Sequence, residues 1–130
     1  MKFLIDTDIA SYGIKGNQKV LKLMHRHLMD WAISSITYHE LTEGLLKAKS
    51  SAMENAFADF IEDVEVLEFS KSGALESGRI SWLLQKQGEP IGNYDTLIAG
   101  QALSLNLTLV TNNEKHFSRV PELRIANWAK

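Results

Sequence analysis

Near the start of the chain, three apolar residues, Phe3, Leu4 and Ile5, run directly into two acids, Asp6 and Asp8. No Gly or Pro interrupts this stretch, and an apolar run bounded by polar residues is typical of a short buried strand. In open α/β sheets, ligands and chemistry are found at the carboxyl ends of the strands. We therefore expect both acids at the functional edge of a sheet.

Apolar spacing predicts that strands alternate with helices along the remaining sequence. Strands are predicted at residues 3–5, 31–36, 64–69, 107–111 and 123–125, and helices at 17–30, 38–49, 51–62, 71–87 and 94–105. Such alternation implies an α/β fold with a mainly parallel central sheet covered on both faces, a three-layer α/β/α sandwich. The length of 130 residues, without repeat or linker, fits one domain spanning residues 1–130.

Several residues predict where individual helices begin and end. Thr37 and Glu40 have the T-x-x-E spacing of a capping box, which predicts a helix start there. Asn93 is expected to cap the helix that carries Asp95. Gly88 is expected to end the preceding helix, and Asn106 suits the left-handed position after the helix that follows.

Composition excludes several classes of protein. The chain has no cysteine, so it has neither a disulfide framework nor a cysteine-based zinc site. No apolar run approaches the roughly 20 residues of a membrane helix. The first apolar stretch is too short for a signal peptide. We therefore expect a cytoplasmic protein without membrane contact. The net charge of −2 argues against a protein that coats nucleic acid non-specifically.

Acids and amides occur where strands end and helices begin. They are Asp6 and Asp8, Glu40, Asp95, and Asn112 with Asn113. Three like charges from Asp6, Glu40 and Asp95 would be unfavourable together unless a cation lay among them. Mg²⁺ or Mn²⁺ fits, because hard cations prefer carboxylate oxygens. Such a site can activate a water and stabilise the leaving oxygen of a phosphodiester.

Local roles compete with the metal-binding interpretation. Glu40 can serve as the capping partner of Thr37, and Asp95 suits the first turn of a helix because of the helix dipole. Asp6 has no local capping role that the sequence identifies, so it is the strongest candidate for a ligand.

Short sequence blocks spread over nearly the whole chain give it a family likeness. The blocks are Phe3–Asp8, Ser34–Leu41, Pro90–Ala99, Leu109–Asn113 with Phe117, Val120–Pro121, and Trp128. With these blocks in this order, the chain resembles the PIN-domain ribonucleases, in particular the VapC-type toxins of bacterial toxin–antitoxin pairs.

The resemblance implies a PIN-like sandwich that cleaves RNA with a bound metal. It assigns the binding of Mg²⁺ or Mn²⁺ to Asp6, Glu40 and Asp95. It further implies tRNA or ribosomal RNA as substrate, a homodimer, and a small cognate antitoxin that inhibits the enzyme. Promoter DNA would be bound only through the antitoxin.

Two departures from the family pattern concern the site. Asp8 stands where the family usually has Asn, and Asn112 and Asn113 stand where many PIN domains have a fourth acid. We hypothesise that Asp8 partly restores the missing negative charge. Thr7 and Thr111 are expected to orient the acids through their hydroxyl groups.

Other residues and functions stay open at this point. Arg79 and Lys115 are candidates for contacts to RNA phosphates. Asp6-Thr7-Asp8 also matches the start of haloacid-dehalogenase-like phosphohydrolases, in which the first Asp is the nucleophile, although no later paired-acid motif is evident. A non-catalytic partner-binding module is the third alternative.

Overall fold

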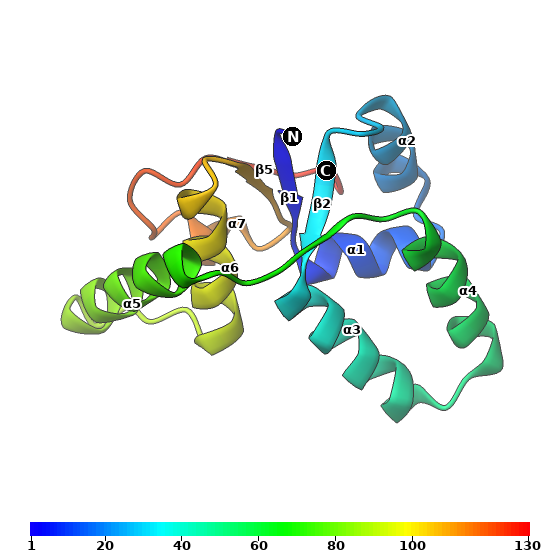
Figure 1. The fold of residues 1–130 in the computed structure, drawn as a ribbon, viewed down its shortest axis with the longest axis horizontal. Coiled ribbons are helices and arrows are strands. Elements are labelled where there is room, and N and C mark those ends of the chain that lie inside the picture. The colour runs from blue at the N-terminus through cyan, green and yellow to red at the C-terminus, as the bar shows by residue number, and fades with distance from the viewer.

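A computed structural model describes residues 1–130, with five short strands and seven helices (Figure 1). The strands are β1 (Phe3–Ile5), β2 (Trp31–Ser34), β3 (Val66–Leu67), β4 (Thr108–Val110) and β5 (Ile125–Ala126). The helices are α1 (Thr7–Ile14), α2 (Gln18–Arg26), α3 (Ser35–Ala48), α4 (Ser51–Glu62), α5 (Lys71–Lys86), α6 (Asn93–Ser104) and α7 (Glu114–Phe117). None of these helices combines the length and the apolar character needed to cross a membrane.

The five strands form one sheet in the order β3-β2-β1-β4-β5, and every neighbouring pair is parallel. The predicted α/β fold is confirmed, with a sheet that is entirely rather than mainly parallel. β1 is the central strand, and its Leu4 lies between Ala32 of β2 and Leu109 of β4. The carboxyl ends of β1, β2 and β4 therefore meet at one edge of the sheet.

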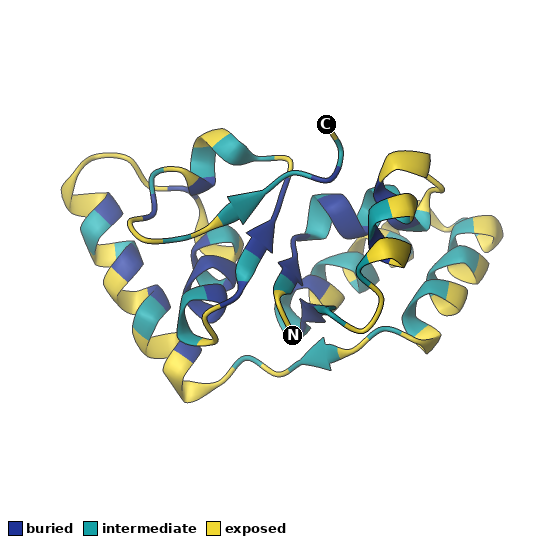
Figure 2. Ribbon diagram, turned by 90° about the horizontal axis from the view of Figure 1, so that it is seen from above, coloured by how far each residue is buried: buried dark blue, intermediate teal, exposed yellow.

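Helices cover both faces of the sheet because successive side chains of a strand point to opposite faces. Leu4 packs into one apolar core with Ile98 of α6. Ile5 packs into a second core with Ile9 of α1 and Val20 of α2. Figure 2 shows the buried residues gathered along the central strands and the exposed residues on the outer faces of the helices. The result is three layers, as predicted.

The layer that contains α5 and α6 depends on a close helix–helix approach at Gly100. A Cβ atom at this position would lie 2.5 Å from the backbone nitrogen of Ser77 in α5, too close for any side chain. The absence of a side chain lets the two helices touch through their backbones. This contact holds α6, and with it Asp95, against the rest of the fold.

Several predicted boundaries were wrong or shifted. α2 ends at Arg26 rather than at residue 30, and β3 spans only Val66–Leu67 of the predicted 64–69. β2 ends at Ser34, whose hydroxyl accepts a hydrogen bond from the amide of Ile36 at 2.9 Å and caps α3. Thr37 consequently lies inside the helix, so the predicted capping box does not form. α6 begins at Asn93 itself and is capped by Gly92, whose φ of 100° favours glycine.

Two helix ends were predicted correctly. Gly88, with a φ of 73°, follows the end of α5, and Asn106, with a φ of 56°, follows the end of α6. Both residues occupy the left-handed conformation that terminates helices.

Candidate active site

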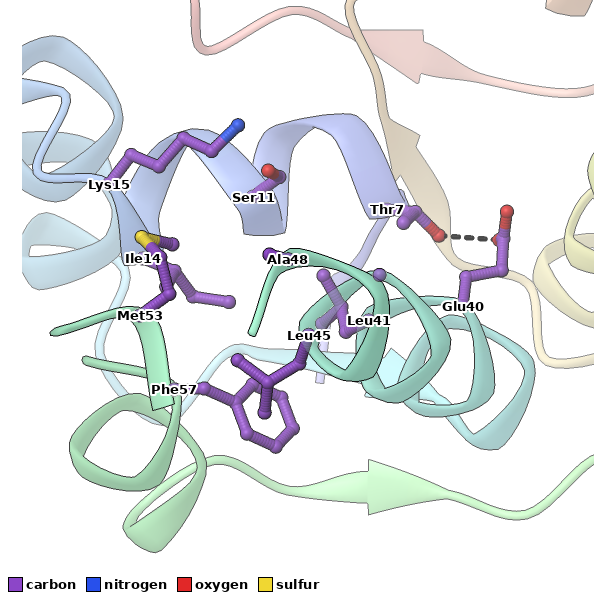
Figure 3. A pocket seen from close by; sticks show the side chains of 11 residues that line it. Thr7, Ser11, Ile14, Lys15, Glu40, Leu41, Leu45, Ala48, Met53 and Phe57 are labelled. Carbon is purple, nitrogen blue, oxygen red and sulfur yellow. Dashed lines mark hydrogen bonds between the residues drawn. The ribbon is translucent and has the colours of Figure 1, made fainter. Parts of the chain in front are cut away.

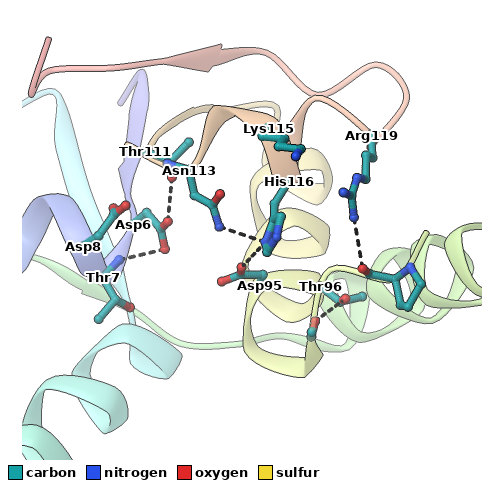
Figure 4. A network of polar contacts seen from close by, with 12 residues as sticks. Asp6, Thr7, Asp8, Asp95, Thr96, Thr111, Asn113, Lys115, His116 and Arg119 are labelled. Atoms are coloured by element: carbon teal, nitrogen blue, oxygen red, sulfur yellow. Dashed lines mark hydrogen bonds and ion pairs between the residues drawn. The ribbon is translucent and has the colours of Figure 1, made fainter.

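Asp6 is the first residue after the central strand and is held by two hydrogen bonds. Its carboxylate accepts one from the amide of Thr7 and one from the hydroxyl of Thr111, each at 2.8 Å (Figure 4). Asp6 is thus the N-cap of α1, so the expectation that it has no capping role was wrong. The parallel pairing of Ile5 with Val110 places Thr111 directly beside it.

Asp8 lies next to Asp6 in the first turn of α1. Its carboxylate accepts hydrogen bonds from the backbone amides of Ile9 at 2.7 Å and Asn112 at 3.2 Å. The second bond ties α1 to the segment after β4. Asp8 therefore faces the same edge of the sheet as Asp6.

The pKa of Asp6 is raised to about 7, first by burial and then by the charge of Asp8. Asp6 is only 4% exposed, and the hydrogen bonds from Thr111 and Thr7 offset part of the effect on its pKa. Burial likewise raises the pKa of Asp8, and its amide hydrogen bonds oppose that increase. Two neighbouring carboxylates with raised pKa values mark a place where added positive charge is favourable.

Glu40 reaches the same region from α3, the helix that follows β2. Its Oε1 accepts a hydrogen bond from the Thr7 hydroxyl at 2.7 Å (Figure 3), and that hydroxyl also lies 3.0 Å from the hydroxyl of Thr37. Because the Thr7 hydroxyl has only one proton to donate, it forms its hydrogen bond to the carboxylate of Glu40. Burial raises the pKa of Glu40, and the Thr7 hydrogen bond partly counteracts this. The polar partner of Glu40 is therefore Thr7, not a capping amide.

Asp95 enters from the first turn of α6 and contacts His116 of α7. Nδ1 of His116 lies 3.6 Å from Oδ2 of Asp95 and 2.9 Å from the amide nitrogen of Asn113 (Figure 4). The shorter contact is the hydrogen bond, whereas the longer one becomes an ion pair when the imidazole is protonated. Burial raises the pKa of Asp95, and the neighbouring His116 opposes that rise.

The acids share one electrostatic environment. After burial and the hydrogen bonds, the charge of Asp95 contributes to the raised pKa values of Asp6, Asp8 and Glu40. No three acids or histidines converge closely enough to enclose an ion as they stand. Glu40 is directed toward Thr7, and Asp95 toward His116. The donors are nonetheless all carboxylate oxygens, the set that a hard divalent cation prefers.

The predicted auxiliary residues divide between the site and the surface. The backbone amide of Asn113 donates to the Thr111 hydroxyl at 2.9 Å. Lys115 lies in α7 next to His116 (Figure 4). Arg79, by contrast, pairs with Glu76 of its own helix at 3.4 Å, and no hydrogen bond or ion pair links it to the acids.

Sequence reasoning did not predict several side chains that support this edge. The Asn127 amide donates to Asn112 and to Glu114, each at 3.0 Å, and the Asn112 amide donates to the hydroxyl of Tyr12 at 3.2 Å. The contact between His116 and Asp95 was also not predicted. No local pattern signals these contacts, because each joins elements that are brought together only by the fold.

A groove of about 290 Å³ opens beside Thr7 and Glu40, between α1, α3 and α4 (Figure 3). Its walls are mostly apolar, with Leu41 and Leu45 on one side and Phe57 on another. The groove therefore links the acidic edge of the sheet to an apolar surface.

Comparison with known proteins places this arrangement in context. Residues 3–123 match the model of the PIN domain family. The chain is 35% identical to the tRNA(fMet)-specific endonuclease VapC of Salmonella typhimurium over 98% of both chains. It is 36% identical to ribonuclease VapC2 of Rickettsia felis over the full length of both.

Solved structures show the same likeness in three dimensions. The chain matches a chain of VapBC2 from Rickettsia felis, bound to a DNA fragment from its promoter, with a TM-score of 0.92 and 34% identity, covering 98% of this chain and 99% of the other. It matches DNA-bound VapBC from Salmonella typhimurium with a TM-score of 0.89 and 37% identity, covering 98% of each chain.

Proposed function

Because the chain belongs to the PIN-domain family, we propose that it is an endoribonuclease and the toxin of a toxin–antitoxin pair. It would block translation by hydrolysing phosphodiester bonds in structured RNA, namely tRNA or ribosomal RNA, with Mg²⁺ or Mn²⁺. The single observation that carries this proposal is that Asp6, Glu40 and Asp95 lie near one edge of a parallel sheet, where the charge of Asp95 acts on the other two acids and the pKa of Asp6 is raised to about 7.

Asp6, Glu40 and Asp95 are the residues proposed to hold the metal. When bound, the ion would supply Lewis acidity toward the phosphate and an activated water. The neighbouring groups orient the carboxylates: Thr111 donates to Asp6, and Thr7 donates to Glu40. Such supporting hydrogen bonds fix the direction of ligands and tune their basicity.

The remaining polar residues complete the proposed site. Asp8 adds negative charge beside Asp6, and the backbone amide of Asn112 holds it in place. Asn113 hydrogen-bonds to His116, which faces Asp95. Lys115 remains a proposed contact for an RNA phosphate. Arg79 is the weaker of the two predicted contacts, because Glu76 already pairs with it.

A haloacid-dehalogenase-like phosphohydrolase is not favoured. Such an enzyme needs a lysine beside its acids, and no lysine forms an ion pair with Asp6 or Asp8. Asp6, the nucleophile in that scheme, is buried and serves as a helix cap. The similarity to ribonucleases over the full chain also argues against a non-catalytic module.

The proposed partners follow from the similar proteins. The two matched structures described above are VapBC complexes, and both are bound to DNA. We therefore assign to this chain a small cognate antitoxin, a homodimeric state, and contact with promoter DNA only through the antitoxin. We also propose that residues 1–130 form a single domain that acts in the cytoplasm.

A cleavage assay tests the function. The purified protein is incubated with tRNA and with ribosomal RNA, in Mg²⁺ and in EDTA. We expect cleavage only with the metal, and its loss in Asp95→Asn. Asp59→Asn is the matched control, because Asp59 is exposed on α4 and forms no ion pair. Phosphatase activity without RNA cleavage would overturn the proposal.

Growth offers a second readout in cells. Expression of the chain should arrest growth, and co-expression of a cognate antitoxin encoded by a short reading frame upstream should relieve the arrest. Asp6→Ala should also relieve it. An arrest that persists in Asp6→Ala, at equal protein level, would contradict the proposed role of the acids.

A further inference from the structure

Two aromatic rings, those of His39 and Tyr94, meet beside the acids. Nε2 of His39 and the hydroxyl of Tyr94 lie 3.0 Å apart and share a hydrogen bond whose donor depends on the imidazole tautomer. The ring centroids are 5.5 Å apart, and the planes are inclined by 57°. Each ring immediately precedes an acid of the proposed site, His39 before Glu40 and Tyr94 before Asp95.

The fold explains why residues 55 positions apart form this pair. α3 follows β2 and α6 precedes β4, so both helices begin at the edge of the sheet where Asp6 lies. The second turn of α3 and the first turn of α6 thus carry both the acids and the rings. The rings are part of the rim of the acidic site.

Neither ring is needed to fill the apolar core. Tyr94 is 42% exposed, His39 is exposed, and neither belongs to either core cluster. Tyr38, the neighbour of His39, differs because its ring packs edge-on against Phe57 at 5.7 Å. His39 and Tyr94 therefore present ring surface to solvent, and the aromatic contact that each makes is with the other.

We infer that His39 and Tyr94 form a stacking platform for an unpaired base next to the RNA phosphate that is cleaved. This inference rests on the proposed ribonuclease function. Unpaired RNA bases are commonly bound by stacking on aromatic side chains, including histidine. Stacking tolerates any base, because every base has a π-face.

The negative charge of the site makes an uncharged contribution to RNA binding useful. The chain has a net charge of −2, and four acids gather at this edge, so the protein itself repels a phosphate backbone. Stacking on aromatic rings adds attraction that does not depend on phosphate charge. The hydrogen bond between the two rings fixes their mutual inclination, so the platform is in place before the RNA arrives.

Two labelled probes separate stacking from backbone binding. One is a single-stranded RNA of twelve adenosines, and the other is an abasic oligomer with the same number of sugar-phosphate units. Affinity is measured by fluorescence anisotropy in Ca²⁺, and the probes are checked on a gel to be intact. The wild-type protein should bind the adenosine probe roughly tenfold more tightly than the abasic probe.

The variants identify the ring responsible. Tyr94→Ala should weaken binding of the adenosine probe roughly tenfold and leave binding of the abasic probe unchanged. Tyr94→Phe keeps the ring but loses the hydrogen bond to His39, so its affinity for the adenosine probe should lie between those of Tyr94→Ala and the wild-type protein. Tyr38→Ala, which removes an exposed tyrosine whose ring packs against Phe57, is the control and should change neither value.

Equal binding of the two probes by the wild-type protein would overturn the platform. So would a Tyr94→Ala variant that loses affinity for both probes to the same extent, because that loss would reflect general structure. These failures are distinct from failure of the proposed function. If the protein cleaves RNA but Tyr94→Ala does not weaken binding of the adenosine probe selectively, the platform is refuted and the proposed ribonuclease function stands.

Discussion

The hydroxyl of Thr111 donates a hydrogen bond to the carboxylate of Asp6 at 2.8 Å across 105 positions of sequence. The two residues meet because β1 and β4 are adjacent and parallel, and each residue directly follows its strand. Both side chains are buried. This bond fixes the direction of the central acid, so we expect it to matter for metal binding.

Removing the Thr111 hydroxyl should weaken metal binding. Thr111→Val keeps the shape of the side chain but leaves the Asp6 carboxylate without its buried donor. The Mg²⁺ concentration that gives half-maximal RNA cleavage should rise roughly 10- to 100-fold. Thr111→Ser, which keeps the hydroxyl, should stay close to the wild-type value. An unchanged Mg²⁺ requirement in Thr111→Val would refute the orienting role.

The raised pKa of Asp6 predicts how the stability of the metal-free protein changes with pH. Burial, followed by the charge of Asp8, raises this pKa from 3.8 to about 7, so the folded state holds the proton more tightly than the unfolded state. Between about pH 4 and pH 7 this group therefore reduces stability progressively as the pH rises. Above that window the full penalty is present.

The Asp6→Asn variant isolates this contribution. Its melting temperature in EDTA should exceed that of the wild-type protein by an amount that grows from pH 4.5 to pH 8. Asp59→Asn should show no such trend. If the difference in melting temperature between Asp6→Asn and the wild-type protein stays constant or shrinks as the pH rises, the pKa of Asp6 is not raised in the folded protein.

Asp8 is expected to strengthen metal binding through its charge. Asp8→Asn keeps one oxygen acceptor, so it can retain the hydrogen bond from the amide of Ile9 but not also the one from Asn112, which uses the other carboxylate oxygen, and it removes the charge that acts on Asp6. We predict that the affinity for Mg²⁺ falls several-fold, which is the effect expected when one charge interaction near a protein surface is lost. A metal-titrated cleavage assay measures it. The same affinity in Asp8→Asn as in the wild-type protein would reject compensation by Asp8.

The contact between α5 and α6 can be tested without touching the acids. Gly100→Ala should destabilise the protein by about 1–3 kcal/mol or more, because its Cβ would overlap the backbone of Ser77. Gly78→Ala on α5 meets no neighbour and should stabilise the helix by about 0.5–1 kcal/mol. Urea denaturation measures both. Equal effects of the two substitutions would mean that the helices can separate freely.

Much of the fold was predictable because it depends on local patterns and on strand polarity. The apolar run before Asp6 predicted a buried strand, which the structure places at the centre of the sheet, and parallel strands place their carboxyl ends at one edge. The helix starts were less predictable. Ser34 and Thr37 are both suitable N-cap residues. Ser34 becomes the N-cap of α3 because β2 stops pairing with β1 just before it. Asp6 caps α1 because that helix begins without an intervening turn.

The side-chain partners of the acids could not be predicted from sequence. Thr7 lies 33 positions from Glu40, and His116 lies 21 positions from Asp95 in a different helix. Neither pair has a periodic or capping relationship. Their contacts arise from the order of strands in the sheet, which no local pattern encodes.

Binding of Mn²⁺ to the wild-type protein and to Asp95→Asn tests the central claim, that Asp6, Glu40 and Asp95 jointly hold a divalent ion. Free Mn²⁺ is followed by electron paramagnetic resonance during titration, with Asp59→Asn as the control. We predict saturable binding by the wild-type and control proteins, and affinity reduced roughly tenfold or more in Asp95→Asn. The same Mn²⁺ affinity in all three proteins would contradict the proposed site.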